Sequence, residues 1–139
     1  MATGDRGGYS GTPLVTKLGY KPNARVYLDA APAGYAELVA PLPKGVEFVA
    51  APRKPLDLVH LFTSSATELA AKLRRYRPLV EPAGVIWVSW PKKAAKVATD
   101  VTEDVVRELA LPLGLVDVKV CAVDATWSGL KLVVRKELR

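Results

Sequence analysis

Cysteine and histidine are almost absent from this sequence, which contains one of each among its 139 residues. A single cysteine cannot form a disulfide within the chain, and it excludes a metal site built from several thiolates. Cys121 stands in the apolar run VDVKVCAVD and is expected to be a buried, inert thiol. His60 lies in the middle of PLDLVHLF, which favours a hydrogen-bonded core imidazole over a catalytic one. Nucleophile systems of the Cys/His or Ser/His/Asp type therefore have few residues to draw on, and we expect no metal site.

Long apolar runs are also missing. No stretch of about 18 apolar residues occurs, and the start MATGDRGGYSG lacks the charged-then-apolar pattern of a secretory signal. We therefore expect a cytoplasmic protein without membrane association. Half of the residues are hydrophobic and 24% are charged, which indicates one globular domain at 11–139 after a polar, glycine-rich flexible tail at 1–10.

Acidic residues are fewer than basic ones, so the formal net charge is +6 and the isoelectric point is about 9.6. This balance permits attraction to phosphates, anionic ligands or nucleic acid. The basic residues are nevertheless spread along the chain, so charge alone does not select a partner.

The first half of the sequence alternates short strand and helix patterns. The segment GTPLVTKLG has the end signals of a helix: Thr12 as its N-cap, Pro13 at its first position and Gly19 in the left-handed conformation at its end. Further elements are expected at 24–30 (strand), 34–40 (helix), 45–50 (strand) and 55–62 (strand). The last of these is almost continuously apolar, which indicates a central strand covered on both faces.

The middle of the chain continues the alternation. Ser65 and Glu68 have the spacing of a capping box before a helix that ends near Pro78. The apolar segment GVIWVSW at 84–90 then predicts another strand, in which Trp90 serves packing.

The last third predicts one helix and a hairpin. Thr102 is the expected cap of the helix, and Val101, Val105 and Leu109 are expected to form its buried stripe. Strands are expected at 116–123 and 130–136. The connection DATWSG is too short for a parallel crossover, so the last strand should be antiparallel.

Together these elements predict an α/β fold: a three-layer, Rossmann-like arrangement with a mostly parallel sheet ending in an antiparallel hairpin. The stretches LVEPAGVIWVSW and LGLVDVKVCAVDATWSGLKLVVRK resemble the fifth strand and the final hairpin of the class I methyltransferase fold. More narrowly, YSGTPLVTKLG and WPKKAAKVATDVTEDVVRELALPLGLVDVKVCAVDATWSGLKLVVR are similar to a family of uncharacterised bacterial proteins, over residues 9–135. The resemblance implies a reduced methyltransferase-like fold and no established activity.

Two departures from the methyltransferase pattern disfavour S-adenosylmethionine as a cofactor. The segment YLDAAPAGY holds Asp29 and Gly34 without a glycine-spaced loop, and Pro32 removes a backbone donor there. The link APRK before the central strand is far too short for a helical crossover, so a strand and two helices of the full fold should be missing. The segment at 45–50 is then either a very short parallel strand with an extended return or an antiparallel strand.

Ligands of open α/β sheets lie beyond the carboxyl ends of the parallel strands. That rule selects eight candidate ligand-binding residues: Asp29, Lys92, Lys93, Lys96, Asp100, Asp124, Thr126 and Trp127. Lysines suit a phosphate or carboxylate, and a tryptophan offers a flat face to a ring. The alternatives are a solvated lysine loop and a tryptophan that only holds the hairpin turn against the sheet.

Three function classes remain open. The leading hypothesis is a non-catalytic, regulatory domain that binds an anionic small molecule or a protein partner on a methyltransferase-like scaffold. The alternatives are an S-adenosylmethionine-dependent methyltransferase with an altered pocket and a nucleic-acid-associated protein using the basic segment KLRRYR at 72–77. The outer strand at 116–123 also offers an edge for a homo-oligomer.

Overall fold

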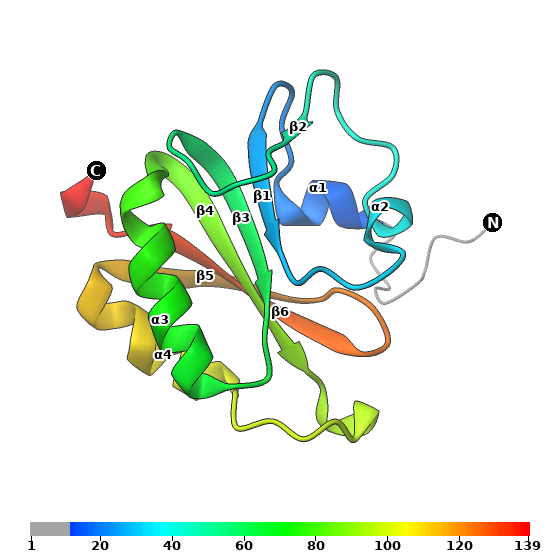
Figure 1. Ribbon diagram of the computed structural model, residues 1–139, viewed down its shortest axis with the longest axis vertical. Coiled ribbons are helices and arrows are strands. Elements are labelled where there is room, and N and C mark those ends of the chain that lie inside the picture. Colours follow the sequence, from blue (N-terminus) through cyan, green and yellow to red (C-terminus); the bar gives the residue numbers. More distant parts are fainter. Residues whose placement is uncertain (1–11) are drawn as a thin grey trace.

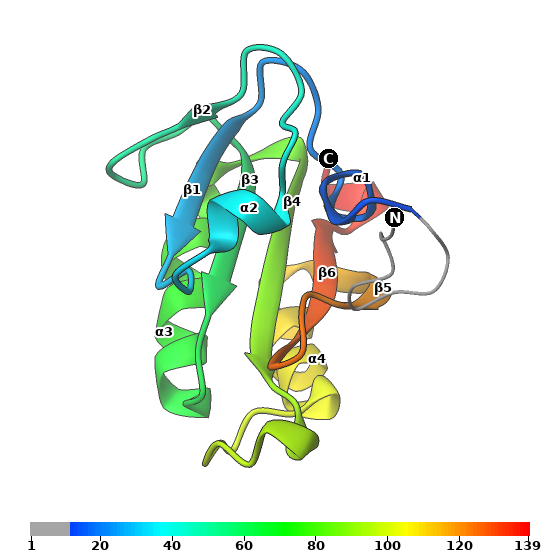
Figure 2. The same ribbon diagram turned by 90° about the vertical axis from the view of Figure 1, so that its right-hand side faces the viewer.

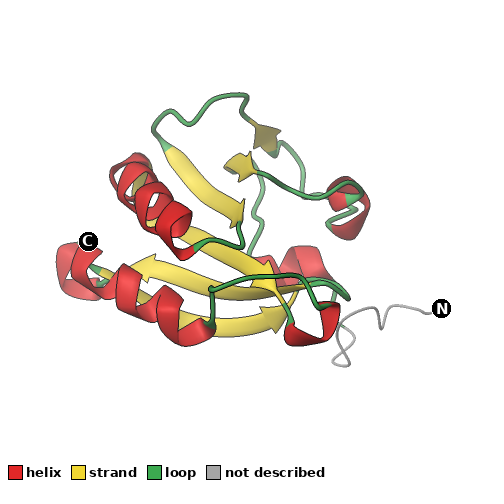
Figure 3. Ribbon diagram, turned by 60° about the horizontal axis from the view of Figure 1, so that its bottom comes forward, coloured by secondary structure: helices red, strands yellow, loops and turns green. Residues whose placement is uncertain are grey.

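A computed structural model describes residues 12–139 as one six-stranded sheet with helices on both faces (Figures 1 to 3). The strands are β1 (Arg25–Asp29), β2 (Glu47–Phe48), β3 (Leu56–Phe62), β4 (Val80–Pro91), β5 (Leu115–Ala122) and β6 (Trp127–Val134). The α-helices are α1 (Leu14–Leu18), α2 (Tyr35–Leu38), α3 (Ala66–Tyr76) and α4 (Glu103–Ala110). Short 3-10 turns occupy Arg77–Leu79, Lys93–Ala95, Leu111–Leu113 and Lys136–Leu138. The tail expected at 1–10 lies outside the described residues.

The strand order β2-β1-β3-β4-β6-β5 confirms the predicted fold class. Strands β2, β1, β3 and β4 pair in parallel, and β6 pairs antiparallel with both β4 and β5. The predicted hairpin is therefore present, with its second strand inserted beside β4. No helix of the described part, residues 12–139, is long and apolar enough to cross a bilayer.

The open choice at 45–50 is settled in favour of the short parallel strand. Strand β2 has two residues, pairs in parallel with the outer side of β1 and leaves its own side chains exposed. Residues 49–55 then form neither helix nor strand and return to β3 on the other side of β1. The antiparallel alternative was wrong, and the helical crossovers of the full fold are absent from this segment.

Two apolar clusters fill the space on the two faces of the sheet. One lies between the sheet and helices α3 and α4 and includes Leu69, Val106 and Trp90. The other lies on the α1 and α2 side and includes Leu18 and Trp87, whose indole N–H donates to the Leu18 carbonyl at 2.8 Å. Strand β3 is buried throughout except at Asp57, as expected of a central strand.

The helix ends confirm some local predictions and correct others. Thr102 accepts a hydrogen bond from the Val105 N–H, and Gly19 ends α1 with a φ of 84°. Helix α1, however, begins at Leu14, so its capping residue is Pro13 and not Thr12. Pro13 stands just before the helix, and its carbonyl accepts hydrogen bonds from the Thr16 and Lys17 N–H groups, each at 3.1 Å.

The capping box is only half formed. The Ser65 hydroxyl accepts from the Glu68 N–H at 3.1 Å, as predicted. The return bond is absent because the Ser65 N–H donates to the Thr63 hydroxyl instead. That arrangement frees the Glu68 carboxylate for other contacts.

The buried stripe of α4 is also shifted from its predicted position. Val106 and Ala110 are fully buried, whereas Val105 is only half-buried and Leu109 packs at the margin of the core. Val101 is buried as expected, but it precedes the helix in non-helical backbone. The predicted stripe assumed that Val101 belongs to the helix. Because Val101 precedes the helix, the buried face of α4 is shifted by one residue, to Val106 and Ala110.

Candidate functional site

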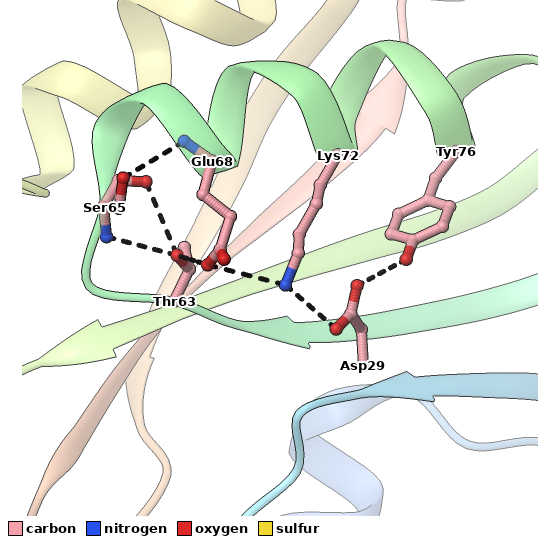
Figure 4. Close-up of polar contacts among 6 residues, drawn as sticks. All are labelled: Asp29, Thr63, Ser65, Glu68, Lys72 and Tyr76. Atoms are coloured by element: carbon pink, nitrogen blue, oxygen red, sulfur yellow. Dashed lines mark hydrogen bonds and ion pairs between the residues drawn. The ribbon is translucent and has the colours of Figure 1, made fainter.

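Between β1 and β3 the order in which the chain adds strands to the sheet reverses. From β1 it goes outward to β2, and from β3 it continues to β4 on the opposite side. Such a switch point, beyond the carboxyl ends of the strands, is where open α/β sheets bind ligands. Asp29 is the last residue of β1, and α3 lies over this position (Figure 4).

Side chains from α3 occupy both carboxylate oxygens of Asp29. Lys72 Nζ donates to Asp29 Oδ1 at 2.9 Å, and the Tyr76 hydroxyl donates to Asp29 Oδ2. The Asp29 and Lys72 side chains are 15% and 19% exposed. This partly buried pair joins the end of β1 to α3.

The network continues along the helix towards its first turn. Lys72 Nζ lies 3.6 Å from Glu68 Oε1, which also accepts a hydrogen bond from the Thr63 hydroxyl at the end of β3. We call these five residues, Asp29, Thr63, Glu68, Lys72 and Tyr76, the switch-point cluster (Figure 4). Its two carboxylates and one ammonium group hold the end of β3 and the end of β1 against the same helix face.

The pKa of Tyr76 keeps its hydroxyl a hydrogen-bond donor to Asp29. Burial raises the pKa of Tyr76 above its usual range, and the hydrogen bond to the Asp29 carboxylate raises it further. Tyr76 therefore stays protonated and remains a donor to Asp29. A ligand hydroxyl that approached Asp29 would have to compete with Lys72 and Tyr76 for the same carboxylate.

The loop after β1 closes the same region from the other face of the sheet. Ala30 and Gly34 have φ angles of 59° and 87°, and α2 begins directly after Gly34. The turn places the Tyr35 side chain in the core, where it is 4% exposed. The loop thus delivers an aromatic side chain inward instead of presenting a glycine-lined surface.

Tyr35 belongs to a buried polar chain around the single histidine. Its hydroxyl lies 2.8 Å from His60 Nδ1 and 2.8 Å from the Tyr20 hydroxyl, and His60 Nε2 lies 2.8 Å from Ser89 Oγ. Burial lowers the pKa of His60 to about 3 and raises that of Tyr20 to about 12. His60 is therefore a neutral core imidazole bonded at both nitrogens, as its place in an apolar strand predicted.

Four of the predicted ligand residues come together at the hairpin tip. The Lys92 N–H donates to the Thr126 carbonyl at 2.8 Å, which joins the end of β4 to the hairpin. Asp124 Oδ1 accepts from the N–H groups of Thr126 and Trp127, each at 2.8 Å. The Trp127 ring packs edge-on against Phe62, with centroids 5.1 Å apart, so it holds the turn against the sheet.

Within residues 12–139, the other predicted residues make no contact of this kind with the hairpin. Asp100 Oδ1 accepts from the Ala66 N–H at 2.7 Å and so caps the start of α3. Lys93 and Lys96 are exposed in the loop after β4. Asp29 bonds to α3 as described. A ligand role for these residues stays a prediction.

Sequence reasoning missed the partners of Asp29. Glu68, Lys72 and Tyr76 are spaced four apart and therefore share one face of α3, which was the available signal. Cys121 also differs from expectation because it is half-buried, and partial burial raises its pKa. Within residues 12–139, no three His, Cys, Asp or Glu side chains are grouped to hold a metal ion.

Comparison with known proteins adds evidence on the fold. No protein-family model and no curated protein sequence matches this chain. Among solved structures, the ribosomal protein L11 methylase of Lactobacillus delbrueckii subsp. bulgaricus aligns with a TM-score of 0.57 and 10% identity, over 87% of this chain and 74% of that one. Magnesium protoporphyrin IX methyltransferase from Synechocystis PCC 6803 aligns with a TM-score of 0.57 and 13% identity, over 87% of this chain and 76% of that one.

Aeropyrum pernix fibrillarin, in complex with S-adenosyl-L-methionine, aligns with a TM-score of 0.55 and 13% identity, over 82% of this chain and 68% of that one. At such low identity these similarities bear on architecture alone. The chain has a methyltransferase-like Rossmann fold.

Proposed function

We propose that this chain is a non-catalytic binding or regulatory domain built on a methyltransferase-like scaffold. The observation that carries the proposal is the state of Asp29. Its carboxylate stands at the switch point, and both oxygens are held by Lys72 and Tyr76 of the chain itself. A nucleoside hydroxyl that bonded to Asp29 would have to share this carboxylate with Lys72 and Tyr76.

The rest of the region supports the same reading. Strand β2 is reduced to two residues, and residues 49–55 return without a helix. A nucleoside at the switch point would therefore meet little backbone from this side of the sheet. The loop after β1 supplies Pro32 and the buried Tyr35 in place of a glycine-spaced turn.

The second candidate function is an S-adenosylmethionine-dependent methyltransferase with an altered pocket. The observation that favours it is the structural similarity to methyltransferases, including a fibrillarin in complex with that cofactor. The nucleic-acid alternative is weaker because the basic segment at 72–77 is partly engaged. Lys72 bonds to Asp29 and Arg77 Nε donates to the Leu113 carbonyl, which leaves Arg74 and Arg75 exposed.

Two further parts of the proposal rest on the sequence. Membership of a family of uncharacterised bacterial proteins follows from the similarity over residues 9–135. A cytoplasmic location is the second. Both stay predictions.

Calorimetric titration with S-adenosylmethionine and S-adenosylhomocysteine tests the proposal. We expect no saturable heat for either ligand up to about 1 mM. Saturable micromolar binding at one site per chain would contradict it and favour the methyltransferase. A Lys72→Met variant is the matched comparison: if the wild type does bind at the switch point, this substitution should change the affinity, whereas Lys44→Met, on an exposed loop, should not.

A further inference from the structure

A hollow with a volume of about 410 Å³ lies at the amino ends of the parallel strands, away from the switch-point cluster. Its lining comes from the turn after α1, the starts of β3 and β4, the second half of β6 and Arg139. The volume is in the range of small-molecule sites, which is about 300–1,000 Å³.

Lys131 is the unusual residue of this hollow. It stands on β6, an interior strand, with Trp87 of β4 and Lys119 of β5 as its neighbours in register. Its side chain faces α1, since its Nζ would lie 3.9 Å from a Cβ placed on Gly19. Within the described chain, residues 12–139, the Lys131 ammonium forms no hydrogen bond or ion pair.

The surroundings of Lys131 oppose its charge. Burial lowers the pKa of its ammonium, and the nearby Lys119 and Lys21 lower it further. A half-buried charge among like charges is destabilising unless an anion compensates it. Lys21 lines the same hollow and lacks an acidic partner among the described residues.

The remaining walls are suited to an apolar ligand body. Val85 and Val133 line the hollow together with Ala24 and Leu58. Two carboxylates, Asp57 and Glu81, also reach it. Asp57 Oδ2 accepts the Arg25 backbone N–H at 2.8 Å, and neither carboxylate is among the groups that shift the pKa of Lys131.

We propose that this hollow binds a small phosphate monoester with an apolar or aromatic body, with Lys131 and Lys21 contacting the phosphate. The two ammonium groups match the charge of about −2 on such a phosphate at neutral pH. The apolar walls then receive the organic part. This site is independent of the switch-point cluster, so it stands whether or not the chain binds S-adenosylmethionine.

Fluorescence titration with 1-naphthyl phosphate tests the site on the full chain. We expect saturable binding with a Kd below about 1 mM, weaker binding of 1-naphthoate, and none of the neutral 1-naphthol. Inorganic phosphate should compete only weakly because it lacks the apolar body. Equal binding of 1-naphthol, or no saturation by the phosphate, would overturn the proposal.

Variants locate the binding. Lys131→Met keeps the apolar length of the side chain and removes its charge, so it should weaken binding at least about tenfold. Lys21→Met, on an exposed turn, should weaken it several-fold and serves if Lys131→Met fails to fold. Arg74→Met removes one positive charge from the exposed side of α3, which lies on the opposite face of the sheet from α1, and should leave the Kd within about twofold of the wild type.

Unchanged affinity in both Lys131→Met and Lys21→Met would overturn the proposal. The urea midpoint of Lys131→Met should equal or exceed that of the wild type, because an uncompensated charge is removed; a large loss would assign Lys131 a purely structural role. Salt-sensitive binding of single-stranded RNA, lost in Lys131→Met while 1-naphthyl phosphate does not bind, would assign the surface to a different partner.

Discussion

Removal of the Asp29 carboxylate tests whether the switch-point cluster is a structural joint. In Asp29→Ala, Lys72 loses its 2.9 Å contact and the Tyr76 hydroxyl loses its acceptor. Hydrogen bonds to charged groups contribute about 1.5–3 kcal/mol each, so two give about 3–6 kcal/mol as an upper bound.

The structure reduces that figure. Water reaches the partly exposed Asp29 and Lys72 side chains, and Lys72 keeps Glu68 at 3.6 Å. We therefore expect Asp29→Ala to lower the free energy of unfolding by about 2–3 kcal/mol. That loss should lower the urea midpoint by about 1 M.

A double-mutant cycle makes the assay specific to the joint. Tyr76→Phe should cost about 1–2 kcal/mol, and the double variant should cost about 1 kcal/mol less than the sum of the single ones. Glu47→Ala is the control, because it breaks an exposed ion pair with Arg25 and should cost about 0.5 kcal/mol or less. Additive losses, or an Asp29→Ala variant as stable as the control, would refute the structural reading.

Two further predictions concern stability. Because the folded pKa of His60 is about 3 and its unfolded value is about 6.5, the unfolded chain binds one more proton between these limits. His60 therefore adds stability that is complete above about pH 6.5 and is lost as pH falls towards 3, with a slope of up to about 1.4 kcal/mol per pH unit. Urea unfolding measured from about pH 7 to about pH 5 should show this pH dependence of the free energy of unfolding in the wild type, and His60→Gln should lose it. An equal slope in both proteins would contradict a buried, neutral imidazole. Asp100→Ala should cost about 1 kcal/mol because the Ala66 N–H at the start of α3 loses its acceptor, and an unchanged urea midpoint would leave that carboxylate without a capping role.

The sequence was most informative where a local pattern had one physical solution. The apolar run at 55–62 could only be satisfied by a strand buried on both faces, and it is β3. The short DATWSG connection allowed only a hairpin, which is present as β5 and β6. The direction of β2 stayed open, because a strand of two residues carries no periodicity.

The switch-point cluster shows why the site was harder to predict than the fold. Asp29 was identified from its place after a strand, but its partners come 43 and 47 residues later in the chain. The four-residue spacing of Glu68, Lys72 and Tyr76 marks one helix face without saying what that face meets. Lys131 was missed for the same reason, since its neighbours Lys21 and Lys119 are brought together only by the sheet and α1.

We propose that the chain's own side chains, Lys72 and Tyr76, hold Asp29 at the switch point in place of a nucleoside. The most direct measurement is a crystal structure of the protein grown with an excess of S-adenosylhomocysteine. We expect Lys72 and Tyr76 to be bonded to Asp29, with no nucleoside at the switch point. S-adenosylhomocysteine bound between the carboxyl ends of β1 and β3, with Lys72 and Tyr76 displaced from Asp29, would contradict it.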